Sequence, residues 1–407
     1  MYKAFQKPVF FFCLVSALIL YGLFGSPTPD NPGMAELGIG GFLILAVLLS
    51  GFAAQEFFIL GQNFFLKSLQ VFFITGLIVP TVTGVYYNND QGLILRDLLS
   101  FMFLGLPLFL AGKIAEDRSM VRWLAIVMAG CGVAFSIRTL MPAFNIWIPQ
   151  GELLYLSNSP LTLFAAVLCA GGFFKGLCGL PRMRLAAWGG AAACLALLAV
   201  LIAAMLLDVQ RATIGAVILS LLFLAAAEFI KAPARALLPC LILAGGAAFF
   251  YPLIGEALTA MAEKTASVGM NMRVAEITAV YERLASAPET VFIGAGWGAV
   301  FSSPAVAGLD VNYTHSLLSG MMLKGGAVMA LLAVIVTLAG LYQIFLIFQK
   351  DRLHGLALFW AFTIPVFLYA SYKSLDFGLV LLLIGVWSIA VERLHPPVRS
   401  DRKKEHI

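Results

Sequence analysis

The sequence predicts an all-α polytopic membrane protein with about twelve transmembrane helices and one large helical loop outside the membrane. Hydrophobic residues make up 61% of the 407 residues and charged residues only 12%, whereas a soluble domain carries about 25% charged residues. Apolar runs of about bilayer length recur along the whole chain, and basic residues gather in alternate connecting segments. A surface this apolar suits lipid rather than water.

Twelve apolar runs approach the roughly 20 residues that a helix needs to cross a bilayer. They cover residues 8–25, 36–54, 69–87, 98–112, 122–140, 160–177, 185–207, 212–230, 236–253, 317–348, 355–371 and 375–391. The first run lacks a small-x-small cleavage site, which predicts a retained helix rather than a signal peptide. The tenth run is too long for one straight span. Because Gly325 and Gly326 interrupt it, residues 317–324 are expected to form a separate segment that leads into the membrane.

The distribution of basic residues predicts the orientation. With the N-terminus inside, the inner segments hold 18 of the 26 lysine and arginine residues, in agreement with the positive-inside rule. Both termini are therefore expected in the cytoplasm. The chain then divides into residues 1–253 with helices one to nine, an outer loop at 254–315, and residues 316–407 with helices ten to twelve and a basic tail. The outer loop has six acidic and three basic residues, a net charge of −3.

The outer loop has the pattern of a folded segment. Four apolar residues recur at helical spacing between residues 271 and 287 and predict an amphipathic helix that Pro288 ends: Val274, Ile277, Tyr281 and Leu284. The run Gly294-Ala295-Gly296-Trp297-Gly298 lacks the following helix of a nucleotide-binding motif, so it is interpreted as a tight loop over a site or as a simple turn. Asn312-Tyr313-Thr314 matches a glycosylation sequon, which has meaning only in a eukaryotic secretory setting.

The composition argues against several kinds of site. No basic stripe with interleaved aromatic residues suggests nucleic-acid binding. The six cysteines include no Cys-x-x-Cys pair, and none lies in the outer loop, which argues against a disulfide framework or a thiolate metal site. The carboxylates of the outer loop are scattered around one histidine, so we expect no metal and no cofactor.

Basic residues on the predicted outer side are candidates for binding a phosphorylated substrate. Ionisable residues at membrane level are costly and commonly functional, and the planar fork of arginine matches phosphate oxygens. Arg211 begins the eighth span and Arg273 lies in the first turn of the loop helix, while Arg138 and Lys373 are further possible members. The simpler alternatives are that Arg138 and Arg211 snorkel to the interface and that Arg273 forms a surface salt bridge with Glu276.

His315 is the candidate general base. It is the one histidine on the predicted outer side, and it lies where the loop meets the tenth span. A neutral imidazole can accept a proton from an attacking hydroxyl group at neutral pH. The alternative is a histidine with a purely structural role.

Three local features of the chain carry a family resemblance. They are Gln210-Arg211-Ala212-Thr213-Ile214-Gly215 at the start of a span, the loop from Asn271-Met272-Arg273 to Gly298, and His315-Ser316 followed by Gly325-Gly326. With the topology of the whole chain, these features resemble the O-antigen ligase and O-antigen polymerase superfamily of bacterial envelope glycosyltransferases, most specifically over residues about 205–345.

The ligases of that superfamily resemble one another in a short pattern. It consists of His, then Asn, Ser or Gln, nine residues, Gly, two residues, and Gly, Thr or Tyr. His315, Ser316 and Gly326 match this pattern, and Met329 departs from it at the last position.

The resemblance implies a metal-independent inverting glycosyltransferase in the bacterial inner membrane, with the outer loop in the periplasm. The donor would be a glycan linked to undecaprenyl pyrophosphate. His315 would be the catalytic base, and Arg211 and Arg273 would hold the pyrophosphate of the lipid carrier. A ligase joins the glycan to lipid A-core, a polymerase joins one lipid-linked repeat to another, and a relative that glycosylates proteins is a third form.

A secondary transporter or flippase is the alternative from another class, because twelve spans suit one well. Transporters bind substrate near the bilayer midplane, often at broken helices in paired halves. Here the predicted midplane is nearly free of charge, no internal repeat relates the halves, and the polar residues gather in one outer loop. These observations favour an enzyme.

Overall fold

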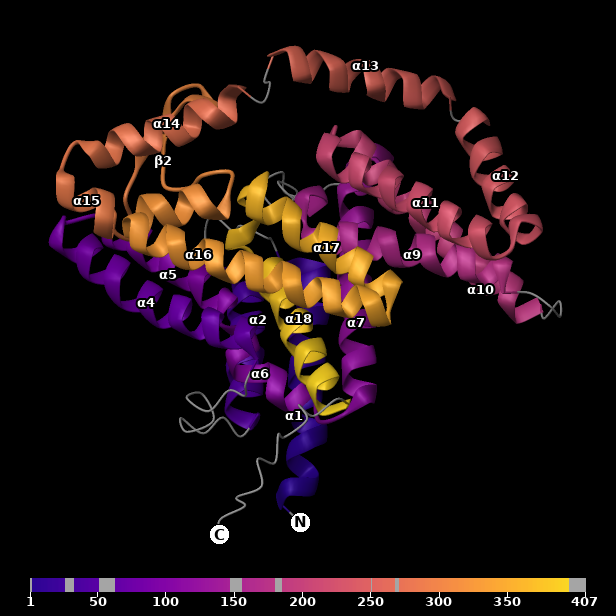
Figure 1. Cartoon of the computed structure of the whole chain (residues 1–407), viewed down its shortest axis with the longest axis horizontal. Coiled ribbons are helices and arrows are strands. Elements are labelled where there is room, and N and C mark those ends of the chain that lie inside the picture. The colour runs from indigo at the N-terminus through magenta and orange to yellow at the C-terminus, as the bar shows by residue number, and fades with distance from the viewer. Residues whose placement is uncertain are drawn as a thin grey trace, which may run out of the picture.

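The computed structural model describes residues 2–25, 33–50, 63–146, 156–179, 185–249, 251–267 and 271–394 (Figure 1). The helices are α1 (Tyr2–Phe24), α2 (Met34–Leu49), α4 (Phe64–Tyr86), α5 (Gln91–Leu104), α6 (Leu106–Ile114), α7 (Arg118–Leu140), α9 (Pro160–Cys178), α10 (Leu185–Leu207), α11 (Arg211–Lys231), α12 (Pro233–Phe249), α13 (Tyr251–Ser267), α14 (Asn271–Ala285), α15 (Pro288–Ile293), α16 (Leu317–Lys350), α17 (Arg352–Phe367) and α18 (Leu375–Leu394). Short 3-10 turns occur at Met141–Phe144, Leu156–Asn158, Pro304–Val306 and Ala370–Lys373. The basic loop at Arg182 and Arg184 and the basic tail lie outside the described residues.

The expected all-α membrane architecture is confirmed. Eight helices of the described chain are long and apolar enough to cross a membrane, and four shorter apolar helices of 10–17 residues accompany them. Each of the twelve apolar runs predicted from the sequence overlaps one of these helices. The number of membrane crossings itself stays a prediction.

The helices α1 and α7 run parallel to each other. At the start of α1, Lys7 Nζ lies 2.7 Å from the Asp117 carboxylate, which precedes α7. At the other end, Arg138 in the last turn of α7 donates to the carbonyl oxygen of Gly25, just past α1, at 2.7 Å. Parallel directions are expected for the first and fifth helices of an alternating membrane chain. In Figure 1, α13 and α14 lie at the end of the molecule opposite to the start of α1.

The centre of the bundle is occupied by α18 (Figure 1). Residues 374–386 are all buried, and the helix packs against α5, α6, α7, α9, α16 and α17. The buried stretch includes every face of the helix and even Asp376, which is 0% exposed. The helix α18 is therefore enclosed by protein.

The all-α expectation missed a small antiparallel hairpin. Strands β1 (Phe301–Ser303) and β2 (Leu309–Val311) pair with Ser302 opposite Asp310. Ala307 and Gly308 form the turn with φ values of 58° and 77°, a backbone region in which glycine is unstrained. Three-residue strands are too short to produce an alternating pattern that sequence reasoning can detect.

The helix α16 is broken at the glycine pair, as the sequence predicted. Gly325 has φ −131° and Gly326 has φ 62° and ψ −157°, and both lie outside the helical region. The break leaves carbonyl groups of the preceding turn without partners inside the helix. The N–H groups of Ala295 and Gly296 donate to the carbonyl oxygens of Leu323 and Lys324, both at 2.9 Å. The run 294–298 is therefore a buried insertion into α16.

Trp297 anchors the same insertion to α4. Pro80 lies inside α4 and has no N–H to donate to Gly76, four residues earlier. The indole Nε1 of Trp297 donates to the Gly76 carbonyl oxygen at 3.0 Å, and the Trp297 N–H donates to the Pro80 carbonyl oxygen at 2.8 Å. The side chain is only 1% exposed. The indole N–H thus replaces the backbone N–H that Pro80 lacks as the hydrogen-bond donor to the Gly76 carbonyl group.

We expect Gly296→Ala to destabilise the protein strongly. Gly296 has φ 84°, and a Cβ atom there would collide with the backbone of Thr83 and Gly84. A strained backbone and an overpacked contact each cost about 1–3 kcal/mol. The thermal unfolding midpoint in detergent should fall clearly, whereas Gly190→Ala should preserve or raise it, because Gly190 is an exposed helical residue with open space around it. Equal midpoints for the two variants would contradict this account of the insertion.

Candidate functional site

The loop helix α14 contributes two charged residues to the candidate site. Its buried face carries Glu276, Val280 and Leu284, whose spacing of four residues keeps them in line. Arg273 lies one turn before Glu276. The predicted helix at 271–287 is confirmed over Asn271–Ala285. Of the four apolar residues that predicted it, only Leu284 is buried, whereas Val274, Ile277 and Tyr281 are exposed, so the inward face is not the predicted apolar stripe.

His315 pairs with Glu276. The imidazole Nδ1 atom lies 2.9 Å from Glu276 Oε1, and the backbone N–H of His315 donates to Glu276 Oε2 at 3.0 Å. Ser303 of β1 donates its hydroxyl hydrogen to Oε1 at 3.1 Å. The Glu276 side chain is 2% exposed and that of His315 is 19% exposed. The ring of Tyr313 packs edge-on against the imidazole, with 5.7 Å between the centroids.

These contacts control the charge of Glu276. Burial alone would raise the pKa of its carboxyl group, but the hydrogen bonds from His315 and Ser303 outweigh burial and lower that pKa below its ordinary value of 4.5. A carboxylate that accepts several hydrogen bonds is stabilised in its charged form. Glu276 is therefore an anion at neutral pH and can only accept hydrogen bonds.

Arg273 lies within electrostatic range of both Arg211 and Glu276. Burial lowers the pKa of the Arg273 guanidinium, the Glu276 carboxylate opposes that effect, and the like charge of Arg211 reinforces it. Tyr369, between α17 and the turn at Ala370–Lys373, joins the group: its hydroxyl accepts a hydrogen bond from the Ala212 backbone and senses the charges of both arginines. Three of the predicted site residues are thus related through Arg273, which lies within electrostatic range of Arg211 and of Glu276, the partner of His315.

Arg211 is positioned by a tight turn. The helix α10 ends at Leu207 and α11 begins at Arg211, and between them Val209 has a positive φ of 54°. The buried Gln210 donates from Nε2 to the Ser157 hydroxyl at 3.1 Å. Arg211 therefore occupies the first residue of α11, where the N-terminal N–H groups and the helix dipole also favour an anion.

Lys373 belongs to a buried ion cluster beside the site. The two oxygens of Asp97 in α5 lie 2.7 Å from Lys373 Nζ and 2.7 Å from Lys324 Nζ. The N–H of Gly298 donates to Asp97 at 2.9 Å, and Lys373 also donates to the Asn312 carbonyl oxygen at 3.1 Å. Lys373 is thus held by Asp97 and by the segment that leads to His315.

The Asn312 amide belongs to the same cluster. Its Nδ2 atom donates to Asp97 at 3.4 Å, and the residue is only 9% exposed. A glycan needs an accessible amide nitrogen. The Asn312 amide therefore forms a hydrogen bond inside the fold, and this contact explains the asparagine at the sequon position without glycosylation.

Arg138 is a cap on α1. It is 6% exposed and donates from Nη1 to the carbonyl oxygens of Gly25 at 2.7 Å and Gly22 at 3.3 Å. The last carbonyl groups of a helix lack partners within the helix, and a nearby cation stabilises them. The structure thus groups Arg138 with the end of α1, and its side chain does not snorkel to the surface.

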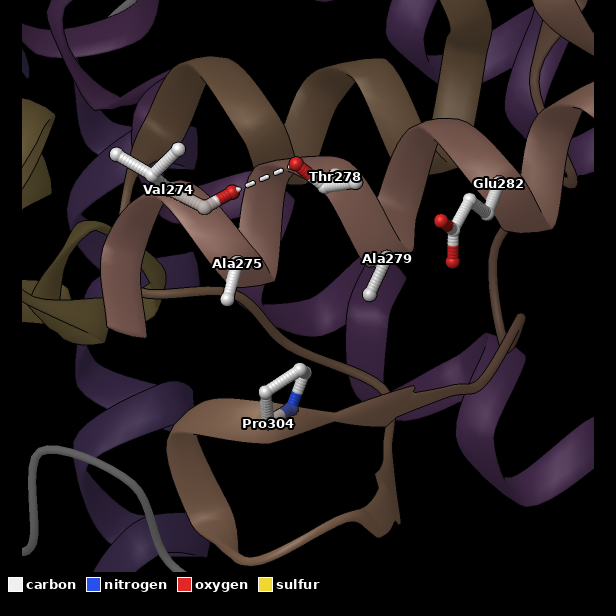
Figure 2. A pocket seen from close by; sticks show the side chains of 6 residues that line it. All are labelled: Val274, Ala275, Thr278, Ala279, Glu282 and Pro304. Carbon is white, nitrogen blue, oxygen red and sulfur yellow. Dashed lines mark hydrogen bonds between the residues drawn. The ribbon is translucent and has the colours of Figure 1, made fainter. Parts of the chain in front are cut away.

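A shallow groove of about 530 Å³ runs along another face of α14 (Figure 2). Ala275 and Ala279 point toward Pro304 of the hairpin, and the Thr278 hydroxyl is hydrogen-bonded to the Val274 carbonyl oxygen at 3.1 Å. Glu282 adds the one charged side chain of the lining. Within the described parts of the chain, no group of three or more His, Cys, Asp or Glu residues could hold a metal ion.

Sequence reasoning placed Lys324 among the cations of the predicted outer level but missed Glu276 and Asp97 as parts of the site region. Glu276 was considered only as a salt-bridge partner of Arg273. The apolar stripe predicted from the sequence gave no signal for it, because Val274, Ile277 and Tyr281 of that stripe are exposed and Glu276 lies on the buried face. Asp97 and Lys324 lie 227 residues apart in sequence, so no local pattern relates them.

The comparisons with known proteins do not identify a relative. No protein-family model matches the chain, and no curated protein matches it. The functional proposal therefore rests on the chemistry of the site.

We expect the contact between α14 and His315 to weaken in acid. Because the pKa of Glu276 is lowered on folding, its contribution to stability is fully present above the ordinary value of 4.5 and is lost as the pH falls through the folded value. Hydrogen exchange of α14 amides, corrected for intrinsic rates, should accelerate below about pH 4.5. The amides of α10, a helix without carboxylates, serve as the reference. Exchange of α14 that is independent of pH would contradict the prediction.

Proposed function

We propose that the protein transfers a glycan from undecaprenyl pyrophosphate to an acceptor hydroxyl at the periplasmic face of the bacterial inner membrane. The observation that supports this proposal is that Arg273 lies within electrostatic range of both Arg211 and the Glu276–His315 pair. The two guanidinium groups lie within electrostatic range of each other, and one carboxylate lies near Arg273, so the group has an excess positive charge that suits a diphosphate. A histidine beside it suits the activation of a hydroxyl group.

The reaction is a displacement at the anomeric carbon. His315 removes the proton of the acceptor hydroxyl as the oxygen forms a bond to the anomeric carbon. The bond from that carbon to the pyrophosphate oxygen breaks, and undecaprenyl pyrophosphate departs with the electron pair. Attack from the side opposite to the leaving group inverts the configuration. Arg211 and Arg273 stabilise the negative charge that develops on the leaving group.

The membrane architecture supports a lipid-borne donor. Arg211 begins a 21-residue helix with the length and composition of a membrane span, and the interface level is where the headgroup of a lipid carrier would lie. We propose lipid A-core as the acceptor, as in a ligase. A second lipid-linked glycan, as in a polymerase, is the other acceptor compatible with the same base and the same arginines.

His315→Ala should lower glycan transfer by about 10²–10⁴-fold, because a general base contributes about this factor. The assay uses protein reconstituted in proteoliposomes with a lipid-linked glycan and measures transferred product at matched protein amounts. His354→Ala is the matched control, since His354 pairs with Asp351 at 2.8 Å in a similar way but starts α17. Turnover of His315→Ala at the level of the control would end the proposal.

Arg211→Lys and Arg273→Lys should each lower kcat/KM for the lipid-linked donor by about 10–100-fold. Lysine keeps the positive charge but loses the planar fork that binds two phosphate oxygens together. Arg118→Lys at the exposed start of α7 is the control. Activity equal to wild type in both lysine variants would show that neither guanidinium binds the leaving group.

A further inference from the structure

We propose that Glu276 is a positioning residue that holds His315 in the tautomer with its proton on Nδ1, so that Nε2 is the atom that accepts the acceptor proton. This inference rests on the proposed function, in which His315 is the base. It adds a residue to the site that neither the motif nor the spacing of the sequence indicates.

The hydrogen bonds that Glu276 accepts determine which ring nitrogen of His315 carries the proton. An ionised carboxylate has no proton to donate. Its Oε1 atom lies 2.9 Å from His315 Nδ1 and accepts from Ser303, and its Oε2 atom accepts from the His315 backbone. The proton between Nδ1 and Oε1 therefore has to come from the imidazole. Because a neutral imidazole carries only one N–H, Nε2 bears the lone pair.

The same carboxylate fixes the orientation of the ring. It binds both the backbone and the ring of His315, so the residue is held at two points by one rigid helix. Tyr313 packs against the ring with an interplanar angle of 70°. Glu276 is buried, whereas His315 retains partial exposure. Substrate can therefore reach the imidazole while its Nδ1 edge stays occupied.

Glu276 also stabilises the product of proton transfer. When Nε2 takes the proton from the acceptor, the imidazole becomes a cation, and the carboxylate at Nδ1 stabilises that cation. No proton needs to pass to Glu276. The alternative is that Glu276 merely ties α14 to the start of α16 and has no influence on the ring.

Glu276→Gln separates these two roles. The amide oxygen can replace Oε2 and accept from the His315 backbone, so α14 stays attached. The amide NH₂ then replaces Oε1 and donates to Nδ1, while the Ser303 hydroxyl turns to accept from it. This arrangement moves the imidazole proton to Nε2 and removes the base. We expect kcat to fall by about 10²–10⁴-fold, with little change in KM for the donor.

The matched control is Glu282→Gln on the same helix. Glu282 is exposed on the face that lines the groove, so the same chemical change should leave turnover at the wild-type level. A loss of activity in both variants would mean that negative charge on α14, rather than the pairing with His315, is what the reaction needs. That result would overturn the assignment of Glu276.

A direct measurement of the tautomer tests the proposal without substrate. Nitrogen-15 spectra of ring-labelled histidine in lipid nanodiscs distinguish a protonated from an unprotonated ring nitrogen. The His315 signals are identified by their loss in His315→Gln, and His354 beside Asp351 is an internal reference. We expect Nδ1–H at His315 in the wild type, Nε2–H in Glu276→Gln, and no change at His354.

The outcomes are distinguishable from a failure of the proposed function. A wild-type His315 with its proton on Nε2 would overturn the positioning role, even if Glu276→Gln does not fold. So would an unchanged His315 tautomer in a folded Glu276→Gln variant. By contrast, wild-type glycan transfer by His315→Ala would refute the proposed function while leaving the measured tautomer intact.

Discussion

The insertion of residues 294–298 into the break of α16 is the constraint on which the arrangement of the site depends. A helix that breaks among apolar neighbours exposes carbonyl groups that lipid cannot satisfy. The backbone of Ala295 and Gly296 supplies the missing donors, and Trp297 supplies a donor to the interrupted ladder of α4. The segment of residues 294–298 is thereby attached to α16 and α4 at once. Glycine is required at 296 because no Cβ atom fits against Gly84.

Asp97 connects the same part of the structure to the segment that carries His315. It binds Lys324 before the break, Lys373 before α18, and the backbone of Gly298. Isolated charges are costly to bury, and a buried ion is tolerated when its partners satisfy it. Since Lys373 also binds the Asn312 backbone, the position of His315 three residues later is set by contacts to α5 and to the turn before α18.

The candidate site is therefore assembled from elements that are distant in sequence. Arg211 comes from the start of α11, Arg273 and Glu276 from α14, and His315 from the residue before the cap of α16. Arg211, Arg273 and His315 each lie at or beside the start of a helix, and Glu276 lies one turn further into α14. Preorganised charges of this kind stabilise a charged transition state without reorganising at the moment of reaction.

Several features follow from the sequence alone because they depend on local chemistry. Composition and run length determine the membrane helices, periodicity determines α14, and two adjacent glycines determine the break in α16. The types of residue at Arg211, Arg273 and His315 already marked them as candidates. The link from Arg273 to Arg211 on one side and to the Glu276–His315 pair on the other is a property of the tertiary structure.

Only the tertiary structure decided which partner each charge has. Glu276 binds His315, Lys373 binds Asp97, and Arg138 caps α1. The sequence could not determine these pairings, because the partners are far apart in the chain. Which residue pairs with a buried charge depends on which one the packing of the helices brings within hydrogen-bonding distance. The sequence by itself determined which chemical groups the protein has, and the packing of the bundle decided which of them meet.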